Sequence, residues 1–166
     1  MSKVLIVSDT HYLRRPDLKK FIESFDVETT IHCGDIYPGF KRGDIVNIYL
    51  CKGNNDYGDI VSECRFEIDG LKFLTTHGHK GYAYQPKTLL NYLYEDDYDV
   101  ICFGHTHVPY YYNDGKTIII NPGSLTLGRT FPRLNTYVLF DTETKIPTFY
   151  NAKDNSVVNI ENSYKK

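Results

Sequence analysis

The residues best suited to chemistry in this chain follow short apolar segments. A His-x-His pair, His105 and His107, comes directly after the apolar run 100–103. Imidazole is the commonest protein ligand of divalent transition metals. A single pair of this kind is as often structural as it is metal-binding, so the prediction depends on whether other segments supply further ligands.

Four other apolar segments end in the same way, with Asp, Asn or His side chains within the next few residues. Five of the six histidines of the chain lie in these turns. Such a set suits two divalent ions that share one carboxylate, because it is too large for one tetrahedral site. The candidate ligands are two Asp, one Asn and four His: Asp9, His11, Asp35, Asn54, His77, His105 and His107.

The chemistry of this donor set narrows the metal and the reaction. Mixed oxygen and nitrogen donors favour manganese, iron, nickel or zinc over calcium and magnesium. Two such ions held ~3.5–4 Å apart serve the hydrolysis of phosphate esters. The sequence therefore predicts a dinuclear transition-metal centre, two ions per chain, at the ends of several strands.

The elements that must position these ligands can be predicted from apolar periodicity. Short apolar runs and hairpin turns predict strands, and an i, i+3, i+4, i+7 pattern predicts helices. The fold class is α/β (α+β), with two mixed β-sheets packed as a sandwich, flanking helices and one domain over residues 1–166. The predicted strands are 3–7, 29–33, 45–51, 65–68, 72–74, 99–103, 110–112, 117–120, 135–140, 148–150 and 157–158, and the predicted helices are 16–25 and 85–94.

Composition excludes several classes of function. The net charge of −2 argues against a polymeric nucleic acid substrate. No segment approaches the ~20 apolar residues of a membrane span, and no signal-like segment opens the chain, so we expect a cytoplasmic protein. The four cysteines form no C-x-x-C pair and are expected to be reduced, mostly buried thiols. The fifteen tyrosines, including 110–112, are expected in the core and on sheet faces.

Five short motifs occur in an order that resembles the calcineurin-like metallophosphoesterases. The resemblance extends from residue 3 to about residue 124, and the small size together with the turn at 121–124 resembles the compact YfcE-like phosphodiesterases. It implies a two-sheet sandwich and hydrolysis of phosphodiesters through a metal-bridging hydroxide. The motifs are Asp9-x-His11, Gly34-Asp35, Gly53-Asn54-x-Asp56, His77-Gly78-His79 and Gly104-His105-x-His107.

The resemblance also implies a role for each ligand. Asp9, His11 and His107 would bind the first metal, whereas Asn54, His77 and His105 would bind the second. Asp35 would bridge both ions. Side chains two positions apart on an extended strand share a face, so we expect a turn at Gly104 to aim His105 and His107 at different ions. The substrate would be a small phosphodiester, and related compact proteins suggest a homo-oligomer.

One position departs from the family pattern. Many members carry a histidine after the metal-binding asparagine, which protonates the leaving group, but this chain has Asn55, which cannot act as a general acid. His79 is a candidate replacement, although a hydrogen bond that orients its loop is an equal expectation. We expect His32 to be structural, and Asp56 to orient the Asn54 loop.

Two further predictions stay open at this point. Arg129 and Arg133 follow the 121–124 turn and are candidates to meet a phosphate. A phosphomonoesterase or nuclease could use the same metals. A catalytically weak protein-assembly scaffold of the same fold, as in retromer, is the other alternative, although a scaffold has no need of all seven ligands.

Overall fold

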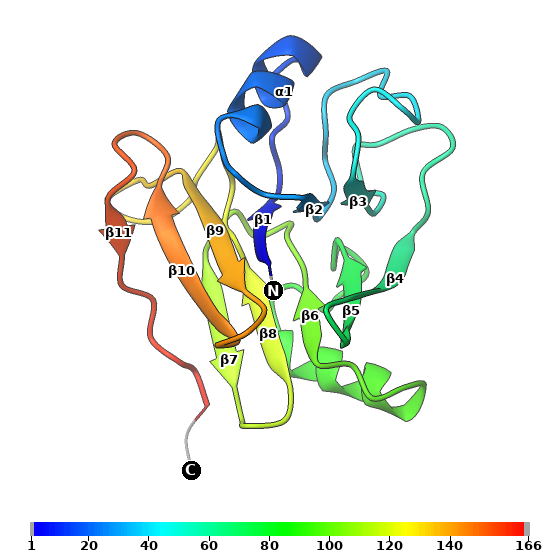
Figure 1. Cartoon of the computed structure of the whole chain (residues 1–166), viewed down its shortest axis with the longest axis vertical. Coiled ribbons are helices and arrows are strands. Elements are labelled where there is room, and N and C mark those ends of the chain that lie inside the picture. The colour runs from blue at the N-terminus through cyan, green and yellow to red at the C-terminus, as the bar shows by residue number, and fades with distance from the viewer. Residues whose placement is uncertain (1, 165–166) are drawn as a thin grey trace.

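The computed structural model describes residues 2–164, which build two mixed β-sheets with one α-helix and one 3₁₀-helix outside them (Figure 1). The six-stranded sheet has the order β11 (Val157–Val158), β10 (Ile146–Asn151), β9 (Thr136–Asp141), β1 (Lys3–Val7), β2 (Thr29–His32) and β3 (Ile48–Leu50). The five-stranded sheet has the order β4 (Glu63–Ile68), β5 (Leu71–Thr76), β6 (Val100–Cys102), β8 (Ile118–Asn121) and β7 (Tyr110–Asn113).

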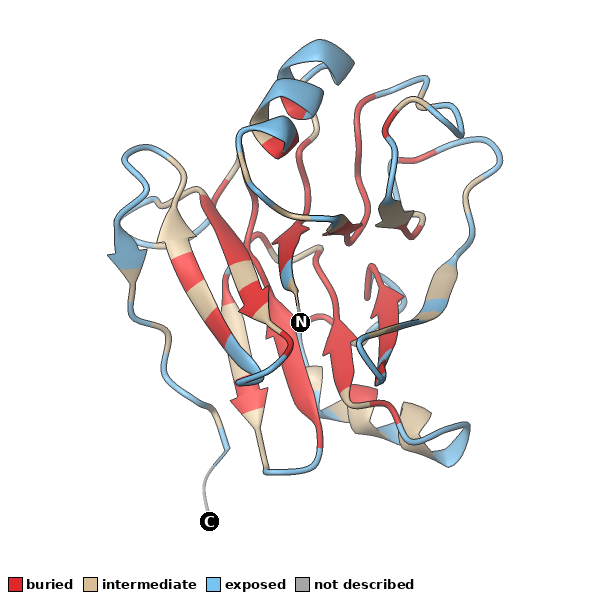
Figure 2. Ribbon diagram, viewed as in Figure 1, coloured by how far each residue is buried: buried red, intermediate tan, exposed pale blue. Residues whose placement is uncertain are grey.

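The main core lies between the two sheets, which confirms the predicted sandwich. Val4 and Ile6 of β1 belong to the same buried cluster as Phe73 of β5 and Val100 of β6. The central strands of both sheets are buried along most of their length (Figure 2). A strand in this position needs apolar side chains on both faces, which explains the uninterrupted apolar run that predicted β1.

The outer face of β1 packs against the α-helix. Leu5 and Val7 share a buried cluster with Leu18 and Ile22 of α1 (Arg15–Glu23). Proline stands in the first turn of this helix, where its missing N–H leaves no hydrogen bond unmade. The predicted helix therefore exists, and its apolar stripe faces the sheet as the spacing required.

The second predicted helix is present and is a 3₁₀-helix, η1 (Pro86–Tyr94). Leu89 is buried as its pattern predicted. Both the backbone N–H and the hydroxyl of Thr88 donate to the Gln85 carbonyl oxygen, at 2.9 and 2.6 Å. These contacts favour hydrogen bonds to the third residue back, as in a 3₁₀-helix, over those to the fourth.

The predicted strand 45–51 is shorter in the structure, where β3 covers only Ile48–Leu50. Asn47 has a left-handed backbone (φ 53°), which a strand residue cannot adopt.

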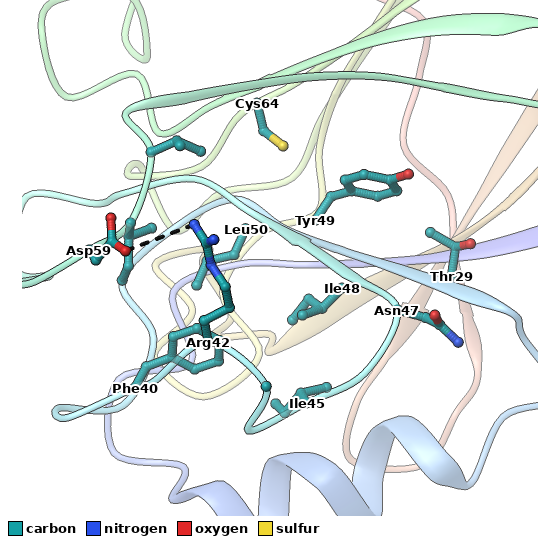
Figure 3. Close-up of a pocket in the computed structure, with 13 residues that line it drawn as sticks. Thr29, Phe40, Arg42, Ile45, Asn47, Ile48, Tyr49, Leu50, Asp59 and Cys64 are labelled. Carbon is teal, nitrogen blue, oxygen red and sulfur yellow. Dashed lines mark ion pairs between the residues drawn. The ribbon is translucent and has the colours of Figure 1, made fainter.

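A mainly apolar pocket of about 400 Å³ lies beside β3 and β4, each of which is a terminal strand of its sheet (Figure 3). The exposed ion pair Arg42–Asp59 (3.9 Å) is part of its lining.

Parallel pairing brings the ligand-bearing loops together. Strands β1, β2 and β3 run parallel, as do β5, β6 and β8, so the loops that follow them emerge at matching edges. Backbone hydrogen bonds tie the loops to one another: the Asp9 N–H donates to Gly34 O (3.0 Å), and the Gly104 N–H donates to His77 O (3.2 Å).

Two expectations from composition can be compared with the structure. Cys33, Cys51 and Cys102 are buried free thiols and Cys64 is partly buried, as predicted. Among the helices of residues 2–164, none has the length and apolar character needed to cross a lipid bilayer.

Candidate metal centre

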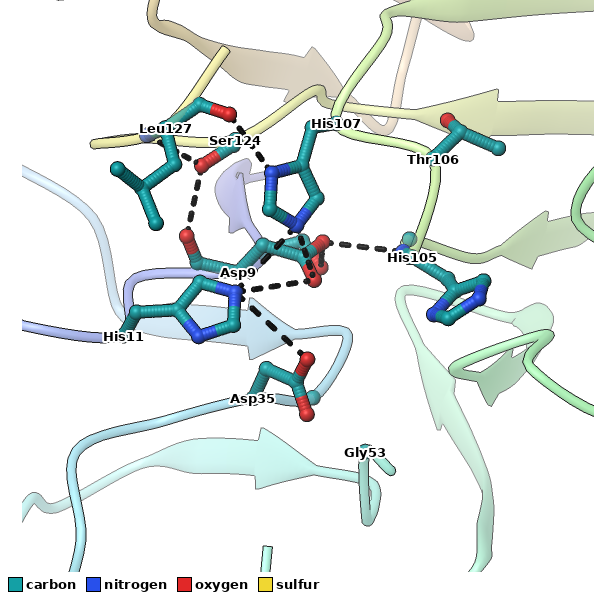
Figure 4. Close-up of polar contacts among 12 residues, drawn as sticks. Asp9, His11, Asp35, Gly53, His105, Thr106, His107, Ser124 and Leu127 are labelled. Carbon is teal, nitrogen blue, oxygen red and sulfur yellow. Dashed lines mark hydrogen bonds and ion pairs between the residues drawn. The ribbon is translucent and has the colours of Figure 1, made fainter. Parts of the chain in front are cut away.

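The structure brings all seven predicted ligands to one place, at the carboxyl ends of five strands. Figure 4 shows Asp9, His11, Asp35, His105 and His107 of this set. Strands β1, β2 and β3 supply one side of the site, and strands β5 and β6 supply the other. The ligands are Asp9 and His11 after β1, Asp35 after β2, Asn54 after β3, His77 after β5, and His105 and His107 after β6.

Asp9, His11 and His107 form the first group of donor atoms. His107 Nε2 lies 3.3 Å from Asp9 Oδ1 and 3.3 Å from His11 Nε2. His11 Nε2 lies 3.8 Å from Asp9 Oδ1. Ligands that surround one ion at ~2.1 Å lie roughly 3–3.5 Å from each other, so these three atoms could hold a single ion after small adjustments.

Asn54, His77 and His105 form the second group. Asn54 Oδ1 lies 3.0 Å from His77 Nε2 and 3.1 Å from His105 Nδ1, and the two ring nitrogens lie 3.3 Å apart. These distances also suit one ion. The two groups match the division into first and second metal that the family resemblance implied.

Asp35 lies between the two groups. Its Oδ2 atom is 3.7 Å from His11 Nε2 in the first group and 3.4 Å from His77 Nε2 in the second. Asn55 holds this carboxylate from outside, because its backbone N–H donates to Oδ1 and its side-chain amide donates to Oδ2, both at 2.9 Å. A carboxylate in this position could contact an ion in each group.

The state of Asp9 provides a test of whether a cation fits the site. Its Oδ2 atom accepts hydrogen bonds from Ser8 Oγ (2.6 Å) and from the His105 N–H (3.0 Å). Its Oδ1 atom is buried and accepts no hydrogen bond from the described residues. A buried polar atom without a partner is destabilising, and a cation among the neighbouring histidines would satisfy it. The residues present therefore fit a metal ion.

Charge in the site also suits cation binding. Burial would raise the pKa of Asp9, but the adjacent His107 and His77 rings and the hydrogen bond from Ser8 outweigh burial and hold the pKa below its usual value. Burial likewise opposes the ionised form of Asp35, but His77 and Asn55 lower its pKa well below the usual range. Both groups are therefore carboxylates at neutral pH, the form that binds metals.

Hydrogen bonds outside the donor atoms orient two histidine rings. His77 Nδ1 donates to the Cys33 carbonyl oxygen (2.6 Å), and His107 Nδ1 donates to the Leu127 carbonyl oxygen (2.7 Å). With Nδ1 protonated, the lone pair of each Nε2 atom points into the site. Such bonds fix the tautomer that a metal needs.

Five of the seven candidate ligands have a left-handed backbone, which is uncommon for residues other than glycine. This conformation concentrates at functional sites, where the surrounding structure enforces it. The φ angles are 51° for Asp9, 35° for His11, 59° for Asp35, 74° for His105 and 62° for His107.

These angles correct the role predicted for Gly104. The positive φ angles belong to His105 and His107 themselves, and these turns aim the two rings apart. Gly104 has no positive φ angle. A Cβ atom on Gly104 would collide with Ser8 Oγ and lie 2.7 Å from Asp9 Oδ2. Gly104 is therefore required because the two ligand loops pack against each other.

Gly104→Ala is expected to displace Ser8 and Asp9 and to lower the affinity of the first group for manganese at least tenfold. Calorimetric titration of metal-free protein with Mn²⁺ measures this affinity. Gly115→Ala is the control, because Gly115 has a left-handed backbone (φ 90°) with open space around it. It should lower stability by about 1 kcal/mol and leave manganese binding unchanged. Unchanged manganese binding in Gly104→Ala would contradict the packing role.

Asp56 and His32 have the structural positions predicted for them. Asp56 Oδ2 accepts from the N–H groups of Asp35 (2.8 Å) and Gly53 (2.7 Å), and its Oδ1 accepts from Ile36 (3.0 Å). It thereby joins the loops after β2 and β3. His32 is fully buried with both ring nitrogens hydrogen-bonded, and burial lowers its pKa to about 4, so it is neutral.

Sequence reasoning missed two serines that support Asp9. Ser8 Oγ donates to its carboxylate, and Ser124 Oγ donates to its backbone carbonyl oxygen (2.7 Å). The position of Ser8 beside a candidate ligand was an available signal. Ser124 is 115 residues from Asp9, and no pattern in the sequence connects the two.

Two residues considered for catalysis occupy different places. Asn55 is at the site, on Asp35. His79 is exposed, its ring centroid is 5.5 Å from that of His77, and it lines a separate small pocket with Tyr82 and Tyr92. Within residues 2–164 no hydrogen bond is formed by the His79 ring, so neither a proton-donor role nor a hydrogen bond that orients its loop is supported by a contact.

A pocket of about 390 Å³ opens over the donor atoms. Arg129 lines this pocket, but Arg133 does not. The Arg133 guanidinium instead donates to the Thr126 carbonyl oxygen (3.4 Å). The pocket beside β3 has nearly the same volume but contains no comparable group of nitrogen and oxygen ligands. Chemistry rather than size therefore identifies the candidate site.

Comparisons with known proteins were consistent with this geometry. Residues 2–145 match the model of the calcineurin-like phosphoesterase superfamily domain. A probable metallophosphoesterase of Bacillus subtilis is 34% identical over 96% of both chains. A phosphodiesterase of Methanocaldococcus jannaschii is 36% identical over 73% of this chain and 82% of its own.

Solved structures share the fold over nearly the whole chain. A predicted phosphoesterase of Streptococcus pneumoniae superposes with a TM-score of 0.78 and 25% identity, over 95% of this chain and 92% of its own. Vacuolar protein sorting 29 of Cryptosporidium parvum superposes with a TM-score of 0.74 and 16% identity, over 95% and 94%. The second likeness shows the fold alone.

Proposed function

Because this chain belongs to the calcineurin-like metallophosphoesterase family, a family of metal-dependent hydrolases, we propose that it is a phosphodiesterase with two divalent transition metals. The observation that carries the proposal is the presence of two groups of donor atoms joined by the Asp35 carboxylate. The phosphodiesterase of M. jannaschii, at 36% identity, supports diesters as the substrate class.

Each group of ligands has its own part in the proposed site. Asp9, His11 and His107 would hold one ion, and Asn54, His77 and His105 would hold the other. Asp35 would serve both ions. Manganese, iron, nickel and zinc all suit these nitrogen and oxygen donors. When bound, the ions supply an activated water and positive charge for the phosphate oxygens. The protein's part is to fix the ligands, through Asn55, Cys33 and the other outer partners.

The leaving group obtains its proton from elsewhere than Asn55. The Asn55 amide donates to Asp35, so in the proposed site it is a positioning residue. His79 is exposed beside the second group of ligands. Its ring centroid lies 5.5 Å from that of His77 and 6.2 Å from that of His105, so it is the candidate general acid. Without a closely held acid, diesters with good leaving groups should react fastest.

Removal of metal is expected to abolish hydrolysis of bis(p-nitrophenyl) phosphate, and Mn²⁺ should restore it. Metal should also raise the melting temperature, because a ligand at 100 times its Kd adds about 2.7 kcal/mol of stability. Elemental analysis should find two ions per chain. Metal-replete protein that hydrolyses neither this diester nor p-nitrophenyl phosphate would refute the catalytic proposal.

The same assay separates the alternatives. Faster hydrolysis of p-nitrophenyl phosphate than of the diester would make the chain a phosphomonoesterase, and cleavage of polymeric DNA or RNA would make it a nuclease. The likeness to vacuolar protein sorting 29 keeps a protein-assembly role as the alternative for an inactive chain. The cytoplasmic location, the single-domain organisation and the homo-oligomer stay predictions from the sequence.

A further inference from the structure

Tyr12 is an exposed aromatic residue at the mouth of the proposed catalytic site. It follows His11 directly and exposes 83% of its surface. The tyrosines of 110–112, by contrast, pack on the sheet as predicted. Its ring centroid lies 6.3 Å from that of His11, with 40° between the planes. Tyr12 also lines the pocket over the donor atoms. A large apolar ring in this position is available to a bound substrate.

Beyond the ligands and Asn55, the wall of the pocket is apolar apart from one cation. Ile36, Pro38 and Leu127 line it together with Tyr12 and Arg129. The Arg129 backbone N–H donates to the His107 carbonyl oxygen (3.0 Å), which fixes this residue beside a ligand loop. Its guanidinium makes no ion pair or hydrogen bond with residues 2–164. The wall therefore offers an aromatic face, aliphatic surface and five unused N–H donors.

We propose, on the basis of the phosphodiesterase function above, that one esterified group of the substrate is a nucleoside whose base stacks on Tyr12. Bases stack on tyrosine rings and on guanidinium planes, and their oxygen and nitrogen acceptors can pair with arginine. A plain alkyl ester would leave the Tyr12 ring exposed, and a plain aryl ester would offer Arg129 no acceptor other than its phosphate oxygens. The pocket of about 390 Å³ falls within the range of small-molecule sites.

Two substrates with the same leaving group test the proposal. The p-nitrophenyl ester of thymidine 5′-phosphate carries a base, whereas methyl p-nitrophenyl phosphate does not. For the metal-loaded wild-type protein, kcat/KM should favour the thymidine ester about tenfold or more, the range expected for one stacked base. Tyr12→Ala should remove most of this preference, mainly through KM, and Tyr12→Phe should keep it.

Tyr94→Ala is the matched control, since Tyr94 exposes 93% of its surface at the end of η1 and does not line this pocket. It should leave both rates unchanged. Arg129→Met should lower the preference for the thymidine ester. Wild-type protein that hydrolyses both esters equally would overturn the nucleoside assignment, whereas hydrolysis of neither would overturn the phosphodiesterase itself. An unchanged preference in Tyr12→Ala would also overturn the assignment.

Discussion

Asp35→Asn should reduce hydrolysis of bis(p-nitrophenyl) phosphate by about 10³-fold or more, because it removes charge between both groups of ligands. An amide has one oxygen that can bind a cation, and its NH₂ group would repel the cation on the other side. It would also face the Asn55 amide, which now donates to Oδ2 at 2.9 Å. We expect the metal content, measured by elemental analysis, to fall with the activity.

Two variants separate the role of Asp35 from general effects. Asp59→Asn makes the same chemical change at an exposed side chain and should leave activity and metal content unchanged. Asn55→Ala removes one hydrogen bond to the Asp35 carboxylate and should reduce activity about 10–100-fold, as for outer partners of metal ligands. Equal losses in Asp35→Asn and Asn55→Ala would show that Asp35 does not connect the two groups.

The largest loss of stability is expected from Asp56→Ala. The substitution leaves three buried N–H groups, those of Asp35, Ile36 and Gly53, without their acceptor. An unsatisfied buried donor is destabilising by ~1–3 kcal/mol, so the free energy of unfolding should fall by about 3 kcal/mol or more. For a chain of 166 residues this corresponds to roughly 6–12 °C in Tm.

Urea unfolding of metal-free protein measures this loss separately from any loss of metal. Asp59→Ala is the control, because surface substitutions usually change stability by less than ~0.5 kcal/mol. Asp56→Asn should lie between the two, since its amide oxygen accepts some of the same bonds. A change in Asp56→Ala no larger than in Asp59→Ala would contradict its role in joining the two loops.

The parts of the fold and site that the sequence predicted follow from local patterns. An uninterrupted apolar run means a strand buried on both faces, as β1 is. Polar residues directly after such strands lie at one edge, because parallel strands end together. Asp9 and Asp35 could therefore be placed side by side without coordinates. The family resemblance then divided the ligands into two groups.

The parts that could not be predicted depend on contacts between distant residues. Asn47 delays the start of β3 through its backbone conformation, although the sequence around it is apolar. The left-handed conformations of Asp9 and His11 accompany hydrogen bonds from their N–H groups to the carbonyl oxygens of Gly34 (3.0 Å) and Asp35 (3.1 Å). No local pattern encodes such bonds, so the sequence did not predict these left-handed conformations.

The left-handed ligands also imply a conflict between the site and the stability of the polypeptide. A residue with a side chain is destabilising by roughly 1–2 kcal/mol in this conformation, and histidine and aspartate tolerate it only somewhat better. Five such residues together oppose folding by an amount comparable with the whole stability of an ordinary domain, about 5–15 kcal/mol. Selection for stability alone would replace them with glycine, so the chain retains these side chains against the preference of its own backbone.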